Sequence, residues 1–111
     1  MVYGTMGGDG QPQTQAAVFT RYALFGQTLE GAVAAPRWLL GRTWGSMSET
    51  LKLEARFAPQ VVEELRSRGH EVEIVGSFDE TIGHAGALVR DPEGALEGAA
   101  DPRSDGGVAG F

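Results

Sequence analysis

The sequence predicts a small α+β fold that forms one unit over residues 1–111. Three observations support this class: apolar residues recur at helical spacing in several segments, they alternate with polar residues in others, and a strong turn signal joins two strand-like segments near the C-terminus. A chain of 111 residues can bury a modest core, and it has no cysteine with which to form disulfides. No repeat and no linker divides the sequence, so we expect a single unit.

The chain opens on a strand-like Val2-Tyr3 that leads directly into a glycine-rich loop. Residues 4–10 contain four glycines, which cannot continue a helix or a strand without cost. A helix is expected around Pro12, because proline is tolerated in a first turn and the charge of Asp9 favours a helix N-terminus. The helix is expected to bury one apolar stripe and to end at Gly26 in a left-handed cap. The stripe consists of Val18, Phe19, Tyr22 and Phe25.

The middle of the chain predicts a short helix followed by extended segments. Thr28 is the expected N-cap of a helix from Leu29 to Ala35, which Pro36 ends. Residues 37–40 read as extended, and residues 49–57 alternate so regularly that we expect a half-buried strand. The inward set would be Leu51, Leu53, Ala55 and Phe57, and the outward set Thr50, Lys52, Glu54 and Arg56.

The C-terminal half predicts one helix and three strands. The helix runs from Pro59 to Arg68 and ends at Gly69, with Val61, Val62 and Leu65 inward. A short strand follows, in which Val72 and Ile74 alternate with glutamates. Residues 85–90 and 95–100 are the arms of a hairpin, because Asp91-Pro92-Glu93-Gly94 between them has proline and glycine where a tight turn favours them.

Composition excludes several classes of function. The formal net charge is −6 and there is no basic run, so we expect neither nucleic acid nor an anionic membrane surface as a partner. No apolar run approaches the ~20 residues that span a bilayer, and Met1-Val2-Tyr3-Gly4 does not resemble a signal peptide. The absence of cysteine removes thiolate zinc sites and cysteine nucleophiles. We expect no cofactor, and the sequence leaves the compartment undetermined.

The pair Gly7-Gly8 carries the main chemical signal. Backbone N–H groups between a strand and a helix start have no helical partner, so they can bind a phosphate or a developing oxyanion. The spacing of the glycines fits neither a Walker loop nor a dinucleotide-binding fingerprint. From the residues alone, a plain structural turn is the competing interpretation.

The histidines and tryptophans favour structural roles. His70 follows a helix end and is expected to face solvent, whereas His84 lies in a loop where it could bond backbone. A zinc site at either histidine would need carboxylates. Trp38 and Trp44 are expected to pack in the core or cover a subunit contact rather than bind a ligand.

The charged residues near the C-terminus form a compact group: Asp101, Arg103 and Asp105. We expect them to form a salt-bridged turn that locks the tail, and the alternative is that they position an active-site loop. The acidic pair Glu63-Glu64 lies on a helix face and is expected to be solvated.

Four segments, in order and at compatible spacings, resemble the gamma-glutamyltransferase (gamma-glutamyltranspeptidase) family of N-terminal nucleophile hydrolases. They are Gly4–Gln13, with the glycine pair; Glu30–Arg37, with Ala-Pro-Arg; Phe57–Val72, a strand–helix–strand segment; and Leu96–Arg103, with Asp-Pro-Arg. The resemblance runs from one end of the chain to the other. It implies the C-terminal portion of an αββα sandwich, in which helices pack on a largely antiparallel sheet.

The resemblance also implies which parts of the enzyme this chain would hold. The family's precursor cuts itself into a large and a small subunit, and the nucleophile is the threonine that begins the small subunit. These segments belong to the end of the small subunit, so the nucleophile and the substrate-binding residues would lie upstream of Met1, and Thr5 is not the nucleophile. The backbone amides of Gly7 and Gly8 would form the oxyanion hole. Asp9-Gly10-Gln11-Pro12 replaces the Ser-Arg that many transferases have there, which favours an amidohydrolase or acylase branch.

Two hypotheses follow. In the first, the chain is part of an enzyme that hydrolyses or transfers the acyl group of gamma-glutamyl or related amides; its partners are the rest of the precursor and a small amide, and the isolated chain is inactive. In the second, it is a stand-alone, non-catalytic binding or assembly module. Unpaired strand edges in the isolated chain would favour homo-oligomers.

Overall fold

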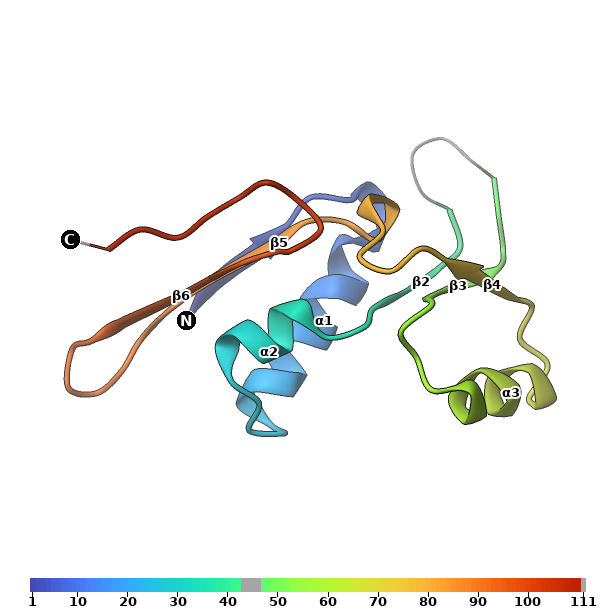
Figure 1. Cartoon of the computed structure of the whole chain (residues 1–111), viewed down its shortest axis with the longest axis horizontal. Helices are drawn as coiled ribbons and strands as arrows, with labels where there is room; N and C mark the ends of the chain where they lie inside the picture. Colours follow the sequence, from blue (N-terminus) through green and yellow to red (C-terminus); the bar gives the residue numbers. More distant parts are fainter. Residues whose placement is uncertain (43–46, 111) are drawn as a thin grey trace.

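The computed structural model describes residues 1–42 and 47–110 and shows an elongated molecule of 47 × 29 × 20 Å. Two three-stranded sheets lie at opposite ends of its long axis, and helices pack against each of them (Figure 1). This is the α+β class that the sequence predicts. Because each sheet has its own helices, the apolar core consists of two separate clusters.

The first sheet has the strand order β1-β5-β6 and is antiparallel throughout. Its strands are β1 (Val2–Thr5), β5 (Ala85–Arg90) and β6 (Leu96–Ala100). The predicted hairpin is confirmed, since the N–H of Gly94 donates to the carbonyl of Asp91 at 3.1 Å and closes the turn between β5 and β6. β1 pairs with β5 so that Thr5 lies opposite Ala85, which brings the start of the glycine loop to the start of β5.

Helices α1 (Gln11–Ala23) and α2 (Leu29–Ala34) pack on this sheet. Both helix starts follow the predictions: Pro12 lies in the first turn of α1, and the Thr28 side chain accepts a hydrogen bond from the Gly31 N–H. The expected apolar stripe of α1 is wrong in part, because Phe25 lies beyond the helix and Phe19 stacks on Tyr3 at the surface. The core here consists of Val18, Leu29, Val33, Ala85, Ala87 and Ala99.

The second sheet has the strand order β2-β3-β4. Its strands are β2 (Trp38–Leu40), β3 (Leu51–Glu54) and β4 (Val72–Val75). β2 runs antiparallel to β3, whereas β3 and β4 are parallel and are joined through α3 (Pro59–Ser67). Leu51, Leu53 and Val62 form its core, and Trp38 packs against it as expected.

The predicted half-buried strand over residues 49–57 is wrong in length and in exposure. β3 covers only Leu51–Glu54, and all four of its residues are buried. β3 is the central strand of its sheet. Lys52 and Glu54 were expected to face solvent, but both side chains bond protein groups. Lys52 Nζ, for example, donates to the Gly41 carbonyl at 3.2 Å. The expected inward position of Val61 is also wrong, since that side chain is exposed.

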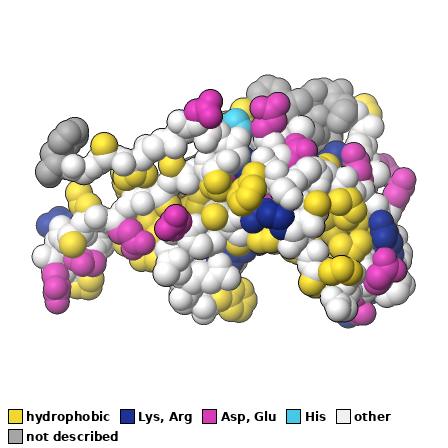
Figure 2. Space-filling model, viewed as in Figure 1, with side chains coloured by type: hydrophobic (Ala, Val, Ile, Leu, Met, Phe, Trp, Pro, Cys, Tyr) yellow, Lys and Arg dark blue, Asp and Glu magenta, His cyan; other side chains and the backbone are white. Residues whose placement is uncertain are grey.

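The face of the first sheet that is turned away from α1 and α2 is only partly covered. The C-terminal tail runs along it (Figure 1), and a cleft of about 550 Å³ lies between tail and sheet. Exposed apolar side chains there include Val2, Leu88 and Val108. Figure 2 shows hydrophobic side chains gathered beside the tail. No helix in the described ranges is long and apolar enough to cross a bilayer.

Candidate functional site

The glycine pair lies on a tight loop between β1 and α1. Gly7 has φ 136° and Gly8 has φ 54°, both positive values that favour glycine. The N–H of Gly10 donates to the Gly7 carbonyl at 2.9 Å, which closes a short 3-10 turn, Gly8–Gly10, in front of α1. The sequence therefore places glycine where the backbone requires it.

Two backbone amides of this loop have no acceptor among the described residues. Within the described residues, neither the Gly7 N–H nor the Gly8 N–H donates to another protein group. Gly7 is buried and Gly8 is exposed. Asp9, the next residue, pairs with Arg42 at 2.8 Å on the surface. Two neighbouring amides without a protein acceptor can stabilise an oxygen that carries negative charge.

The loop rests on the turn that precedes β5. The Met6 N–H donates to the His84 carbonyl at 3.1 Å, and a Cβ on Gly7 would lie 3.4 Å from the Cα of Gly83. His84 thus engages backbone through its carbonyl, and among the described residues its buried Nε2 has no partner. Met6, Glu80, Thr81 and His84 line a small cleft of about 380 Å³ next to the loop.

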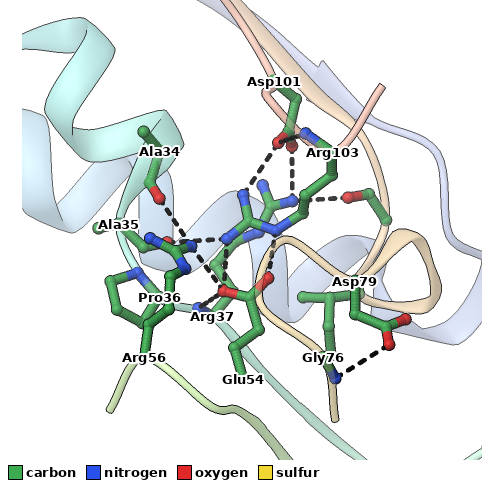
Figure 3. Close-up of polar contacts among 12 residues, drawn as sticks. Ala34, Ala35, Pro36, Arg37, Glu54, Arg56, Gly76, Asp79, Asp101 and Arg103 are labelled. Carbon is green, nitrogen blue, oxygen red and sulfur yellow. Dashed lines mark hydrogen bonds and ion pairs between the residues drawn. The ribbon is translucent and has the colours of Figure 1, made fainter. Parts of the chain in front are cut away.

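Four charged side chains are buried together behind this turn (Figure 3). They are Arg37, Glu54, Asp101 and Arg103, none more than 6% exposed. Arg37 Nη2 donates to Asp101 Oδ2 at 2.5 Å and to the Gly83 carbonyl at 2.6 Å. Asp101 Oδ2 also accepts from the Ala85 N–H at 2.6 Å, so the cluster is hydrogen-bonded to the turn that contacts the glycine loop.

Arg103 is the centre of the cluster. Its Nε and Nη2 donate to the two oxygens of Glu54, each at 2.6 Å, and its Nη1 donates to Asp101 Oδ1 at 2.9 Å. It also donates to the carbonyls of Val33 and Ala35 at the end of α2. One guanidinium therefore connects α2, β3 and the segment after β6. A lysine could not make all of these bonds, because its ammonium lacks the planar arrangement of five N–H donors.

The surroundings favour the ionised forms of Glu54, Asp101 and Arg103. Burial alone raises the pKa of the Glu54 carboxyl, but hydrogen bonds from Arg103 and from the Arg37 N–H, with the nearby positive charges, hold that pKa below its ordinary value. Burial likewise raises the pKa of Asp101, and the Ala85 N–H and the charge of Arg37 lower it further than burial raises it. Burial lowers the pKa of Arg103, yet its bonds to Glu54 and Asp101 give a net increase.

Phe78 and Arg56 cover the cluster on one side. The Arg56 guanidinium lies 3.7 Å from the centre of the Phe78 ring, and Arg56 Nη2 donates to Glu54 Oε2 at 2.8 Å. Phe78 has φ 54°, a conformation that a side chain of this size rarely adopts. The roles of Glu54 and Arg56 could not be predicted from the sequence, because the alternation over residues 49–57 assigns both side chains to solvent.

The structure changes several expectations for the charged and aromatic residues. Asp101 and Arg103 do pair, but Asp105 is exposed and makes no ion pair with any residue that the structure describes. The cluster draws instead on Arg37 and Glu54 from distant segments. Glu63 and Glu64 are solvated, each paired with an arginine on the same helix face.

The two histidines differ in their position relative to the buried cluster, since His84 lies in the turn between Gly83 and Ala85, both of which bond the cluster. His70 is exposed, as expected. Within residues 1–42 and 47–110, no group of three or more histidine, aspartate or glutamate side chains could hold a metal ion. Trp44 lies outside the described residues.

Comparison with known proteins identifies the family. The family model described as gamma-glutamyltranspeptidase matches residues 1–111. The chain is 63% identical over its full length to the oxamate amidohydrolase proenzyme of Klebsiella pneumoniae and 47% identical to the glutathione hydrolase-like YwrD proenzyme of Bacillus subtilis. It spans about a fifth of the length of these relatives, 21% in each case.

Solved structures agree with this assignment. A cephalosporin acylase from Bacillus halodurans matches with a TM-score of 0.86 and 32% identity, over 98% of this chain and 19% of that one. A gamma-glutamyltranspeptidase from Pseudomonas nitroreducens, complexed with L-DON, matches with a TM-score of 0.80 and 28% identity, over 99% of this chain and 54% of that one. The predicted fold and the resemblance of the four segments are confirmed: the chain belongs to the gamma-glutamyltranspeptidase family and has the fold of the corresponding part of N-terminal nucleophile hydrolases.

Proposed function

We propose that this chain is the C-terminal segment of the small subunit of an amide hydrolase and that it supplies the oxyanion loop. The proposal is supported by its share of the curated relatives, about a fifth of their length, and by their description as proenzymes. In this proposal residues 1–111 act as one unit within the processed precursor. The nucleophilic threonine and the groups that bind the substrate belong to the remainder of the protein.

The observation that carries this proposal is the loop with two amides that have no protein acceptor among the described residues. During cleavage of an amide, the threonine hydroxyl adds to the carbonyl carbon and gives up its proton to a base, so the carbonyl oxygen becomes an oxyanion. The N–H groups of Gly7 and Gly8 donate to that oxygen. The carbonyl then reforms, the amine leaves with a proton, and water releases the acid and restores the threonine. The amides bind the charged oxygen more strongly than the neutral carbonyl, and this difference lowers the barrier.

The substrate that we propose first is a small amide whose acyl group carries a carboxylate. The relative at 63% identity is named for oxamate and the one at 47% for glutathione, so oxamate is the first compound to test and a gamma-glutamyl amide the second. The Asp9-Gly10-Gln11-Pro12 sequence after the glycine pair favours hydrolysis over transfer.

The test uses the full-length protein and follows ammonia release from oxamate and anilide release from a gamma-glutamyl anilide. Gly8→Val keeps the backbone N–H but strains the loop at φ 54°, and displacement of that donor is expected to lower kcat by roughly 10²- to 10³-fold, about the effect of losing one oxyanion donor. Gly26→Val is the matched control, because Gly26 has a similar φ of 65° and, like Gly8, has open space where a Cβ would lie. Equal activity of the two variants would remove the oxyanion assignment, and a wild-type protein that cleaves neither amide would remove the proposed reaction.

The rest of the precursor is the proposed partner of the uncovered face of the first sheet. Val2, Leu88 and Val108 leave apolar surface exposed there. The 111-residue chain alone is therefore expected to be inactive and to self-associate. A dilution-stable monomer in light scattering would contradict this expectation, and so would enzyme-like hydrolysis by the isolated chain.

A further inference from the structure

We propose that Gly83 is a positioning residue for the oxyanion loop, and that the turn of residues 83–85 is the rigid support that fixes the amides of Gly7 and Gly8. The proposal rests on the function proposed above for that loop. It assigns a role in positioning to a residue that contacts the loop next to the glycine pair.

Gly83 and the loop are in direct backbone contact. A Cβ on Gly83 would collide with the carbonyl oxygen of Met6 and would lie 3.2 Å from Thr5 Oγ1. The Met6 N–H donates to the His84 carbonyl at 3.1 Å, so the residue before the glycine pair is held from two sides by the same turn. Because Gly83 is buried and has φ 87°, only glycine fits both the conformation and the space.

The turn is itself anchored by buried charges. Its Gly83 carbonyl accepts from Arg37 Nη2 at 2.6 Å, and its Ala85 N–H donates to Asp101 Oδ2 at 2.6 Å. Arg37 and Asp101 are fully buried and pair with each other, so neither can move without losing an ion pair in a low-dielectric interior. The Ile82 carbonyl, one residue earlier, accepts from the buried Thr14 hydroxyl on α1.

These contacts decide which side gives way when Gly83 is enlarged. In the turn, the Gly83 carbonyl and the Ala85 N–H are both bonded to the Arg37–Asp101 pair. The loop is held less firmly, because two of its amides have no acceptor in the described part of the chain. A methyl group on Gly83 should therefore displace the Met6–Gly7 backbone. Oxyanion donors act at roughly 2.7–3.1 Å, and a misplacement of about 1 Å can cost on the order of 100-fold in rate.

The experiment compares Gly83→Ala with Gly69→Ala in the full-length protein. Both glycines have positive φ, 87° and 92°, but a Cβ on Gly69 would meet nothing within 4 Å, so Gly69→Ala places alanine at positive φ without the collision. Gly83→Ala is expected to lower kcat 10- to 100-fold with KM within about twofold of the wild type, because the substrate-binding groups lie elsewhere. Gly69→Ala is expected to keep the wild-type kcat.

Equal kcat values for the two variants would overturn the proposal, as would a change at Gly83 that appears in KM alone.

Native-state hydrogen exchange of the unmodified protein gives a second readout, which does not depend on a variant that folds. The amides of Met6 and Ala85 should exchange with matching protection, because the loop and its support open together. Fast exchange at Met6 with slow exchange at Ala85 would overturn the support. If the wild type cleaves no amide, the proposed function fails, and the exchange measurement still tests the support.

Discussion

Replacement of Glu54 by glutamine tests how strongly the buried charge cluster holds the two sheets together. The Glu54 carboxylate accepts hydrogen bonds from Arg103 Nε and Nη2, both at 2.6 Å, from Arg56 Nη2 at 2.8 Å and from the Arg37 N–H at 3.0 Å. Glutamine keeps the size of the side chain but removes the charge and turns one acceptor oxygen into a donor that faces other donors. Removal of one partner from a buried ion pair costs about 3–5 kcal/mol, a large share of the roughly 5–15 kcal/mol that typically stabilises a protein.

The measurement is urea unfolding of the full-length protein, followed by tryptophan fluorescence. A loss of that size should lower the urea midpoint by on the order of 1 M, since urea m-values are about 3 kcal/mol/M at the upper end for small proteins and increase with size. Glu64→Gln is the matched control, because Glu64 pairs with Arg68 at 2.7 Å on an exposed helix face and such pairs contribute less than about 1 kcal/mol. Indistinguishable midpoints for the two variants would refute the view that burial gives the Glu54 interactions their strength.

Other predictions concern pH and two local contacts. The pKa values of Glu54 and Asp101 are lower in the folded protein than in the unfolded chain, so their ionised forms add stability above the ordinary carboxyl pKa of about 4. That stability is lost as the pH falls through the folded-state values, so the urea midpoint should drop below about pH 4; a midpoint unchanged between about pH 5 and pH 3 would contradict this. Thr28→Ala should lower the free energy of unfolding by about 1 kcal/mol, because it removes the N-cap of α2. An unchanged thermal midpoint would argue against the cap. Gln13→Ala should also cost about 1 kcal/mol, because the Gln13 amide bonds both the N–H and the carbonyl of Leu40; hydrogen exchange at Leu40 as slow as in the wild type would argue against that link.

Local features were predictable from the sequence because neighbouring residues cause them. The hairpin turn, the Thr28 cap and the glycines that end helices depend on backbone conformations that a few adjacent residues dictate. The glycine loop belongs with these features, since Gly7 and Gly8 have the positive φ that the local sequence suggests. The interpretation of that loop as an oxyanion site came from the resemblance to a family, and it remains a prediction until activity is measured.

Side-chain exposure was predicted less well, because periodicity shows which residues share a face and not what covers that face. The alternation over β3 assigns Glu54 to solvent, yet Arg103, 49 positions later, meets it in the interior. Phe25 follows the helical spacing of α1, yet the helix ends before it and leaves the side chain exposed. Asp105 lies close to Arg103 in sequence, yet the tail directs it outward.

The order of helices and strands, the glycine loop and the family can all be inferred from the amino-acid sequence, because each depends on short segments of the chain. The fold is needed to see that four charged side chains meet in the interior and that they bond the Gly83 turn beside the glycine loop: Arg37, Glu54, Asp101 and Arg103. A charge can be buried only where the fold supplies its partners, and here those partners come from segments far apart in the chain.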